Sequence, residues 1–109
     1  MDAPVVFGSR ARDRILFLLA IVGTSYPREL SRSLDISLLT VQRTVNDLER
    51  AGVLATRMMG RTRLAELNPR WFAAAELRSL LERLAESDPS LAEKAAEIRR
   101  RPGRADDPV

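Results

Sequence analysis

The sequence contains neither cysteine nor histidine among its 109 residues. Disulfides, thiolate nucleophiles, imidazole bases and imidazole metal ligands are therefore excluded. A zinc site would have to consist of carboxylates alone, which is not a ligand set that zinc favours. We therefore expect no metal and no cofactor, and a reducing, cytoplasmic location fits the composition.

Long apolar segments are absent as well. The longest one, Ile15 to Val22, has eight residues, whereas a membrane-spanning helix needs about 20. Residues 1–6 have neither a basic start nor a long apolar stretch, so no signal peptide is predicted. The length suits one globular domain, and no membrane association is expected.

Lysine is nearly absent, because Lys94 is the only one of the 18 basic residues that is not an arginine. The net charge of the chain is +3, but residues 1–70 alone hold 11 arginines against 7 acidic residues. Arginine suits phosphates and guanine edges because its planar guanidinium donates two hydrogen bonds at once. A GC-rich coding bias would also raise the arginine content, so composition leaves both explanations open.

Features of an enzyme are missing too. The sequence has no glycine-rich loop that could hold a phosphate, and no nucleophile with a nearby base. The carboxylates lie on expected helical faces among arginines, where ordinary ion pairs explain them. We expect that the chain is not an enzyme.

Hydrophobic spacing and capping residues predict two helices in the first third of the chain. Ser9 is a suitable N-cap for a helix that runs to about Val22. Pro27 fits the first turn of a second helix that ends at Leu34. Asp35 can then adopt the left-handed conformation that closes this helix.

A third helix is predicted from Ser37, a strong N-cap candidate, to Gly52, which suits the position after a helix end. The apolar stripe at spacings i, i+3, i+7 and i+10 consists of Leu38, Val41, Val45 and Leu48. The opposite, outward row consists of Leu39, Gln42, Arg43 and Asn46. Such a helix, apolar on one side and polar on the other, is typical of one that enters the DNA major groove.

Within this outward face, Gln42 and Arg43 are suited to adenine and guanine edges respectively. Thr40 and Ser37, at the start of the helix, can donate hydrogen bonds to a phosphate. Leu39 either contacts a thymine methyl group or belongs to the rim of the core. Whether Asn46 touches a base is left open.

Two short strands, Val53 to Met59 and Thr62 to Leu67, are predicted around a turn at Gly60. The arginines around this turn are Arg57, Arg61 and Arg63. An arginine at a hairpin tip suits the narrow minor groove, although a charged edge strand also deters aggregation. Arg28 and Arg32, one turn apart on the second helix, face either the DNA backbone or solvent alone.

Two amphipathic helices are expected after Asn68-Pro69, with a break at residues 87–89. We expect the core of helices and hairpin to be complete by Leu67, so these helices need a partner, and a second copy is the simplest one. The predicted dimer interface contains Trp71, Leu77, Leu80, Leu81, Leu84, Leu91 and Ile98. Trp71 and Phe72 could anchor that interface, or they could instead line an effector pocket.

The order of helix, helix, tight turn, helix and hairpin predicts a mainly α fold with a small β-hairpin, the winged helix-turn-helix, with two extra C-terminal helices. The chain is accordingly divided into a flexible arm (1–8), a DNA-binding domain (9–68), dimerisation helices (69–101) and a disordered tail (102–109).

The segment SLLTVQRTVNDLERAGVL, residues 37–54, resembles the recognition helix of ArsR/MarR-type transcriptional regulators of bacteria and archaea. Residues 7–16 and 28–31 resemble a subgroup that is often linked to nucleotidyltransferase domains. The resemblance covers about residues 7–68 and implies a dimeric DNA-binding repressor. Its DNA-facing helix positions fall on Ser37, Thr40, Gln42 and Arg43.

The sequence departs from the family pattern at several positions. Ser31 replaces a small alanine in the second helix, and Asp35 replaces the usual glycine of the turn. Leu64 and Ala65 stand where an aromatic pair is common. The metal-sensing members of the family use cysteine and histidine, so that activity is not implied here.

The sequence therefore favours a homodimeric regulator that binds specific sites on double-stranded DNA and acts as a repressor. Its third helix would enter the major groove and its arginine-bearing hairpin the minor groove. The alternative is a protein-interaction module, for example an antitoxin-like partner of a nucleotidyltransferase. A small-molecule effector remains open, as does the operator sequence.

Overall fold

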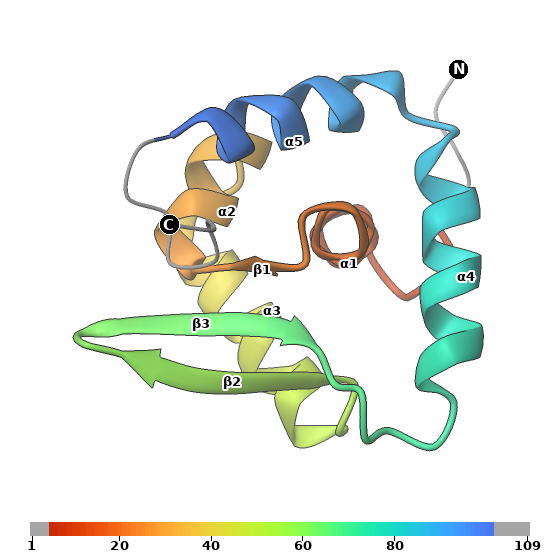
Figure 1. The fold of residues 1–109 in the computed structure, drawn as a ribbon, viewed down its shortest axis with the longest axis horizontal. Helices are drawn as coiled ribbons and strands as arrows, with labels where there is room; N and C mark the ends of the chain where they lie inside the picture. Colours follow the sequence, from red (N-terminus) through yellow and green to blue (C-terminus); the bar gives the residue numbers. More distant parts are fainter. Residues whose placement is uncertain (1–4, 102–109) are drawn as a thin grey trace.

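The structure is a computed structural model that describes residues 5–101. Its helices are α1 (Arg10–Val22), α2 (Pro27–Leu34), α3 (Leu38–Arg50), α4 (Ala74–Ala85) and α5 (Pro89–Arg100). Its strands are β1 (Thr24–Ser25), β2 (Leu54–Met59) and β3 (Thr62–Leu67). Helix α1 lies at the centre, seen end-on in Figure 1, and the other elements surround it. Among the described residues, no helix is both long enough and apolar enough to cross a membrane.

The first three helices begin and end where their capping residues predict. The Ser9 side chain accepts a hydrogen bond from the amide of Arg12 at the start of α1. Asp35 follows α2 with a φ angle of 55°, in the predicted left-handed conformation. Ser31 stabilises the same turn, because its hydroxyl donates a hydrogen bond to the carbonyl oxygen of Ile36. Ser31, which departs from the family pattern, therefore has a role in the turn that follows α2.

The sheet has three strands in the order β1-β3-β2, with all pairs antiparallel. The hairpin of β2 and β3 was predicted, but Thr24 and Ser25 were expected only to interrupt the helical pattern. They instead pair with Glu66 and Ala65 of β3. A strand of two residues has no periodicity of its own, so only its distant partner reveals it. Leu64, next to Ala65 on β3, is 4% exposed, so the strand packs into the core without an aromatic pair.

The predicted start of the fourth helix at Asn68-Pro69 is wrong, because α4 begins at Ala74. The Asn68 side chain is used in a turn instead: its amide donates to the carbonyl oxygen of Gly52 at 2.8 Å, and its oxygen accepts from the amide of Arg70 at 3.0 Å. Trp71 packs over Gly52, where a Cβ atom would lie 3.4 Å from its ring. This turn therefore attaches the end of β3 to the end of α3.

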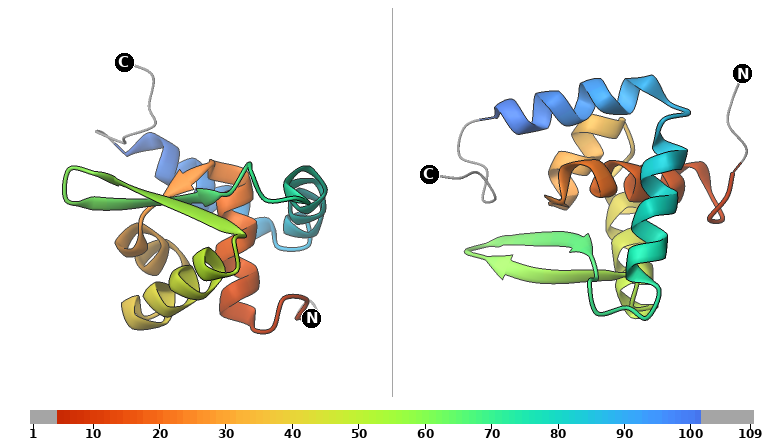
Figure 2. Two further views of the ribbon diagram at one scale, coloured as in Figure 1. Left: turned by 90° about the horizontal axis from the view of Figure 1, so that it is seen from below. Right: turned by 45° about the vertical axis from the view of Figure 1, so that its right-hand side comes forward.

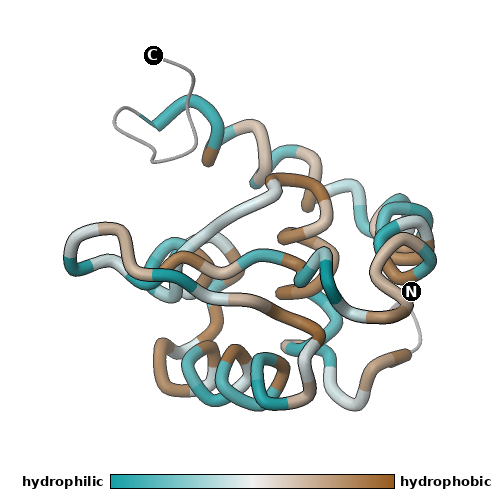
Figure 3. Tube along the Cα trace, turned by 60° about the horizontal axis from the view of Figure 1, so that its bottom comes forward, coloured by the Kyte–Doolittle hydropathy of each residue, from teal (hydrophilic) through white to brown (hydrophobic). Residues whose placement is uncertain are grey.

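The two C-terminal helices complete the core of the chain itself. Leu81 of α4 and Leu91 and Ile98 of α5 are fully buried in one cluster with the apolar residues of α1. Most of α1 is the hydrophobic stretch at the centre of Figure 3. The expectation of a core complete by Leu67 is therefore wrong, and these three side chains are not free for a dimer interface. Their burial against α1 satisfies the apolar faces within one chain.

Other predicted interface residues differ in exposure. Leu77 and Leu84 are partly buried and pack against the same core. Leu80, by contrast, is 46% exposed, and Phe72 in the turn before α4 is 90% exposed. Trp71 is intermediate in exposure, since its side chain is partly buried. Its ring centroid lies 5.0 Å from that of Phe72.

The described residues before α1 are held against the rest of the chain. The amides of Val6 and Phe7 donate hydrogen bonds of 2.9 and 2.8 Å to the carboxylate of Asp13, and Phe7 packs against the core. The predicted flexible arm is therefore wrong for these residues. The rest of the arm, residues 1–4, and the predicted tail, 102–109, lie outside the described residues.

Candidate nucleic-acid interface

Helix α3 presents its two predicted faces. Val41, Val45 and Leu48 are buried, Leu38 is half-buried, and Thr44 is also buried although it was not predicted to be. The outward residues Leu39, Gln42, Arg43 and Asn46 are all exposed. Leu39 is 57% exposed, so most of its side chain is available to a partner. The buried stripe thus fixes which side of α3 a ligand could meet.

The first turn of α3 is fixed by Ser37. Its hydroxyl oxygen accepts a hydrogen bond from the amide of Thr40 at 3.2 Å and donates one to the Thr40 hydroxyl at 2.8 Å. Both residues are exposed at the positive end of the helix dipole. They lie at the helix N-terminus where a phosphate contact is predicted, and that contact stays a prediction.

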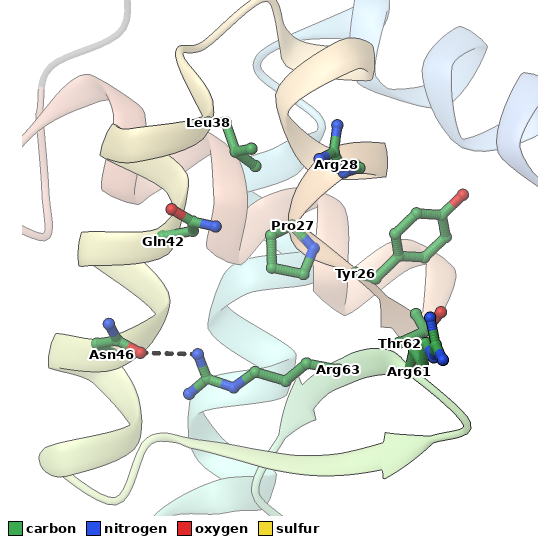
Figure 4. A pocket seen from close by; sticks show the side chains of 9 residues that line it. All are labelled: Tyr26, Pro27, Arg28, Leu38, Gln42, Asn46, Arg61, Thr62 and Arg63. Carbon is green, nitrogen blue, oxygen red and sulfur yellow. Dashed lines mark hydrogen bonds between the residues drawn. The ribbon is translucent and has the colours of Figure 1, made fainter.

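A cleft of about 460 Å³ opens between α3, the start of α2 and the hairpin (Figure 4). It is lined by Tyr26, Pro27, Arg28, Leu38, Gln42, Asn46, Arg61, Thr62 and Arg63. Of the predicted DNA-contacting residues, the cleft brings together Arg28, Gln42, Asn46, Arg61 and Arg63. The others, which are Arg32, Ser37, Leu39, Thr40, Arg43 and Arg57, do not line it.

Tyr26 and Thr62 line the cleft although the sequence did not single them out. Tyr26 occupies the N-cap position of α2 in an extended conformation, next to Pro27. Thr62 follows the hairpin turn and pairs with Met59. A tyrosine directly before a helix-starting proline and a threonine beside the predicted tip arginine are the signals that could have identified them.

A network of polar side chains joins α3 to the hairpin at the floor of this cleft. Arg63 donates from Nη1 to Oδ1 of Asn46 at 2.7 Å and from Nη2 to Oε1 of Glu49 at 2.6 Å. The hydroxyl of Thr56 on β2 donates to the other carboxylate oxygen of Glu49. The hydrogen bond from Thr56, together with the charge and hydrogen bond of Arg63, lowers the pKa of Glu49 against the opposing effect of burial. Glu49 therefore stays ionised and holds both strands to α3.

Two of the arginines that line the cleft, Arg28 and Arg61, differ from the arginines beside Asp47 of α3. Asp47 forms ion pairs with Arg12 at 3.7 Å and with Arg50 at 3.8 Å, on the part of α3 away from the cleft. Within residues 5–101, no acidic side chain pairs with Arg28 or Arg61. The cleft therefore carries positive charge that is not neutralised by the described part of the chain.

The hairpin extends beyond the helices in both views of Figure 2. Near its tip lie Arg57 and Arg61, both exposed, together with Met58 and Met59, which are 63% and 43% exposed. Gly60 makes the turn with a φ angle of 63°, which is costly for most other residues. A narrow projection with arginines at its end is suited to the minor groove.

Within the described part of the chain, no cluster of three or more acidic residues could hold a metal ion. The side chains of the cleft are mainly hydrogen-bond donors and cations. Such a surface is suited to anions such as phosphates.

Comparison with known proteins identifies the fold. No protein-family model and no curated protein matches the sequence. Among solved structures, the adhesin competence repressor (AdcR) from Streptococcus pyogenes is similar with a TM-score of 0.61 and 18% identity, over 83% of this chain and 66% of that one. A mutant of ZitR from Lactococcus lactis in its apo form has a TM-score of 0.59 and 17% identity, over 83% and 65%.

A transcriptional regulator of the MarR family from Rhodococcus sp. RHA1 has a TM-score of 0.52 and 16% identity, over 85% of this chain and 62% of that one. The chain thus spans about two thirds of the length of these proteins. At such low identity the likeness concerns the fold. It confirms the predicted winged helix architecture, which the chain shares with these proteins, among them the regulator of the MarR family from Rhodococcus.

Proposed function

We propose that the chain is a transcriptional regulator that binds specific sites on double-stranded DNA, with α3 in the major groove and the hairpin in the adjacent minor groove. The cleft between these two elements carries the proposal, because Arg28 and Arg61 on its walls have no acidic partner among residues 5–101. Double-stranded DNA carries the complementary negative charge, because a phosphate backbone runs between its major and minor grooves.

Each part of the surface has a different role in this proposal. Gln42 and Arg43 read base edges, and Leu39 contacts a thymine methyl group. Ser37 and Thr40 bind a phosphate at the start of α3. Arg61 enters the minor groove, with Arg57 beside it, while Arg28 and Arg32 contact the backbone from α2.

We further propose that the chain acts as a homodimer and as a repressor. One recognition helix reads few base pairs, whereas two helices about one DNA turn apart read a pseudo-palindrome. Phe72 and Leu80 are exposed apolar side chains at α4, which lies across the molecule from the hairpin tip in Figure 1. A dimer through this side leaves the reading face free. Repression is supported by the likeness to AdcR, which is itself named a repressor.

A binding assay at increasing salt tests the proposal. Sites are first selected from random duplex DNA by the purified protein, and the affinity for the best site is then measured. The logarithm of the affinity should fall linearly with that of the salt concentration, with a slope of about −0.9 for each neutralised phosphate. A slope near zero, or no enriched site, would mean that the chain is not a DNA-binding protein.

A matched arginine provides the control for this assay. Arg61→Ala removes a cation from the cleft, whereas Arg83→Ala removes one from α4 that is 80% exposed and paired with Glu86. The first variant should have a shallower slope by about one phosphate, and the second should match the wild type.

A further inference from the structure

The orientation of the Asn46 amide is fixed by a neighbour that can only donate. The guanidinium of Arg63 has no acceptor atom, so the 2.7 Å contact must be made to the oxygen Oδ1 of Asn46 (Figure 4). Arg63 is itself held by the carboxylate of Glu49 at 2.6 Å. One of the two lone pairs of the Asn46 oxygen is therefore taken by Arg63, which also places a positive charge beside that oxygen, while the NH₂ group of Asn46 is free to meet a ligand.

This NH₂ group stands on the reading face. Asn46 is exposed, lines the cleft and lies one helical turn after Gln42 on the outward row of α3. Its nitrogen makes no hydrogen bond within residues 5–101. Asn46 thus offers free donors, and any base donor that approached its oxygen would do so next to the guanidinium cation of Arg63.

An asparagine whose oxygen is held by a cation reads DNA differently from a free one. A free asparagine pairs with adenine through two hydrogen bonds, because its oxygen accepts from N6 while its nitrogen donates to N7. Guanine offers two acceptors in the major groove, N7 and O6, whereas cytosine offers only a donor. We infer that Asn46, with its oxygen held by Arg63, specifies guanine rather than adenine, so that Arg63 determines specificity without contacting the base.

This inference rests on the proposed function. Selecting preferred sites from random duplex DNA with four proteins, the wild type and three variants, tests the inference and the proposed function separately. The position read by residue 46 is the one whose preference disappears in Asn46→Ala. The wild type should select guanine there. Arg63→Met removes the donor and keeps the aliphatic chain, so the amide can turn, and adenine should gain about fivefold or more over guanine at this position. Arg83→Met, which changes an exposed arginine of α4 outside the cleft, should keep guanine.

Several outcomes overturn the inference. Adenine at this position in the wild type, or the same base in the wild type and Arg63→Met, would show that Arg63 does not set the preference. An Asn46→Ala variant with unchanged preferences would show that this side chain meets a phosphate and not a base. If no protein enriches any duplex, the proposed function itself fails. Circular dichroism of each variant must first show native helix content.

Discussion

Arg63 on β3 donates a 2.6 Å hydrogen bond to Glu49 on α3, and this ion pair joins the two elements that flank the cleft. Both side chains are partly exposed, at 29% and 40%. A single exposed pair contributes little to stability. Here, however, Asn46 and Thr56 add hydrogen bonds to the same two groups, so the network fixes the angle between hairpin and helix.

The first prediction concerns acid. The pKa of Glu49 lies below its ordinary value of 4.5 in the folded chain, mainly because Thr56 donates to its carboxylate. Because the pKa of Glu49 is lower in the folded chain than in the unfolded chain, its stabilising effect is complete at pH values above the unfolded pKa. The effect is lost as the pH falls through the pKa of the folded chain. The free energy of unfolding should therefore decrease below about pH 4.5.

Urea titrations between pH 7 and pH 3 measure this effect. Glu49→Gln and Thr56→Val should each show a smaller decrease than the wild type over the acid part of the range, because they remove the group or its main donor. Parallel curves for all three proteins would contradict the assigned role of Glu49.

The second prediction separates core from surface on α4. Leu81 is fully buried in the chain's own core, whereas its neighbour Leu80 is 46% exposed. Leu81→Ala should lower the free energy of unfolding by about 2–5 kcal/mol. Leu80→Ala should change it by no more than about 0.5 kcal/mol when the chain is monomeric. If the two substitutions cost the same in dilute solution, the packing of α4 on α1 is not as described.

The third prediction uses the N-cap of α3 to separate folding from binding. Ser37→Ala removes the acceptor for the Thr40 amide and should cost about 1 kcal/mol of stability. Ser37→Asp keeps an acceptor at the cap but places a negative charge where a phosphate is proposed. It should therefore fold as stably as the wild type and bind the selected DNA more weakly. Equal affinity of Ser37→Asp and the wild type would remove Ser37 from the interface.

Local signals account for what could be predicted from the sequence. Ser9, Asp35 and Ser37 each act on backbone groups within a few residues, so their roles follow from residue type and spacing alone. The apolar stripe of α3 likewise fixes its outward face. These features were enough for the winged helix fold and for the exposed candidate residues.

The remaining features depend on residues that are distant in sequence. Strand β1 exists because β3 lies beside it, and Ser25 is buried there with a 2.7 Å hydrogen bond to the buried Glu29. The contact between Asn46 and Arg63 spans 17 positions and needs the hairpin to fold back on α3. The apolar residues of α4 and α5 were assigned to a dimer because periodicity shows that a face is buried, but not against which element.

The fourth prediction compares two arginines with different proposed contacts. Arg43→Ala should relax base preference at one position of the selected site, with a loss of about 1–3 kcal/mol on the preferred sequence. Arg61→Ala should weaken binding to all sequences by a similar factor. Affinities for a panel of single-base variants of the site measure both effects. If Arg43→Ala lowers every affinity equally, Arg43 contacts the backbone and not a base.

The last prediction concerns the dimer. Phe72 is 90% exposed and Leu80 46% exposed, and a second copy that covers them would bury apolar surface. Phe72→Glu and Leu80→Glu should therefore convert a dimer into a folded monomer, since a charge at either position is tolerated in water and not in an apolar interface.

Sedimentation measures the mass, and Ala92→Glu, an exposed position on α5, is the control that should keep the wild-type mass. Both variants should also lose affinity for a two-fold symmetric site while retaining the affinity of one half-site. A wild type that sediments as a monomer at the concentration used for DNA binding would contradict the dimer and leave DNA recognition to a single α3.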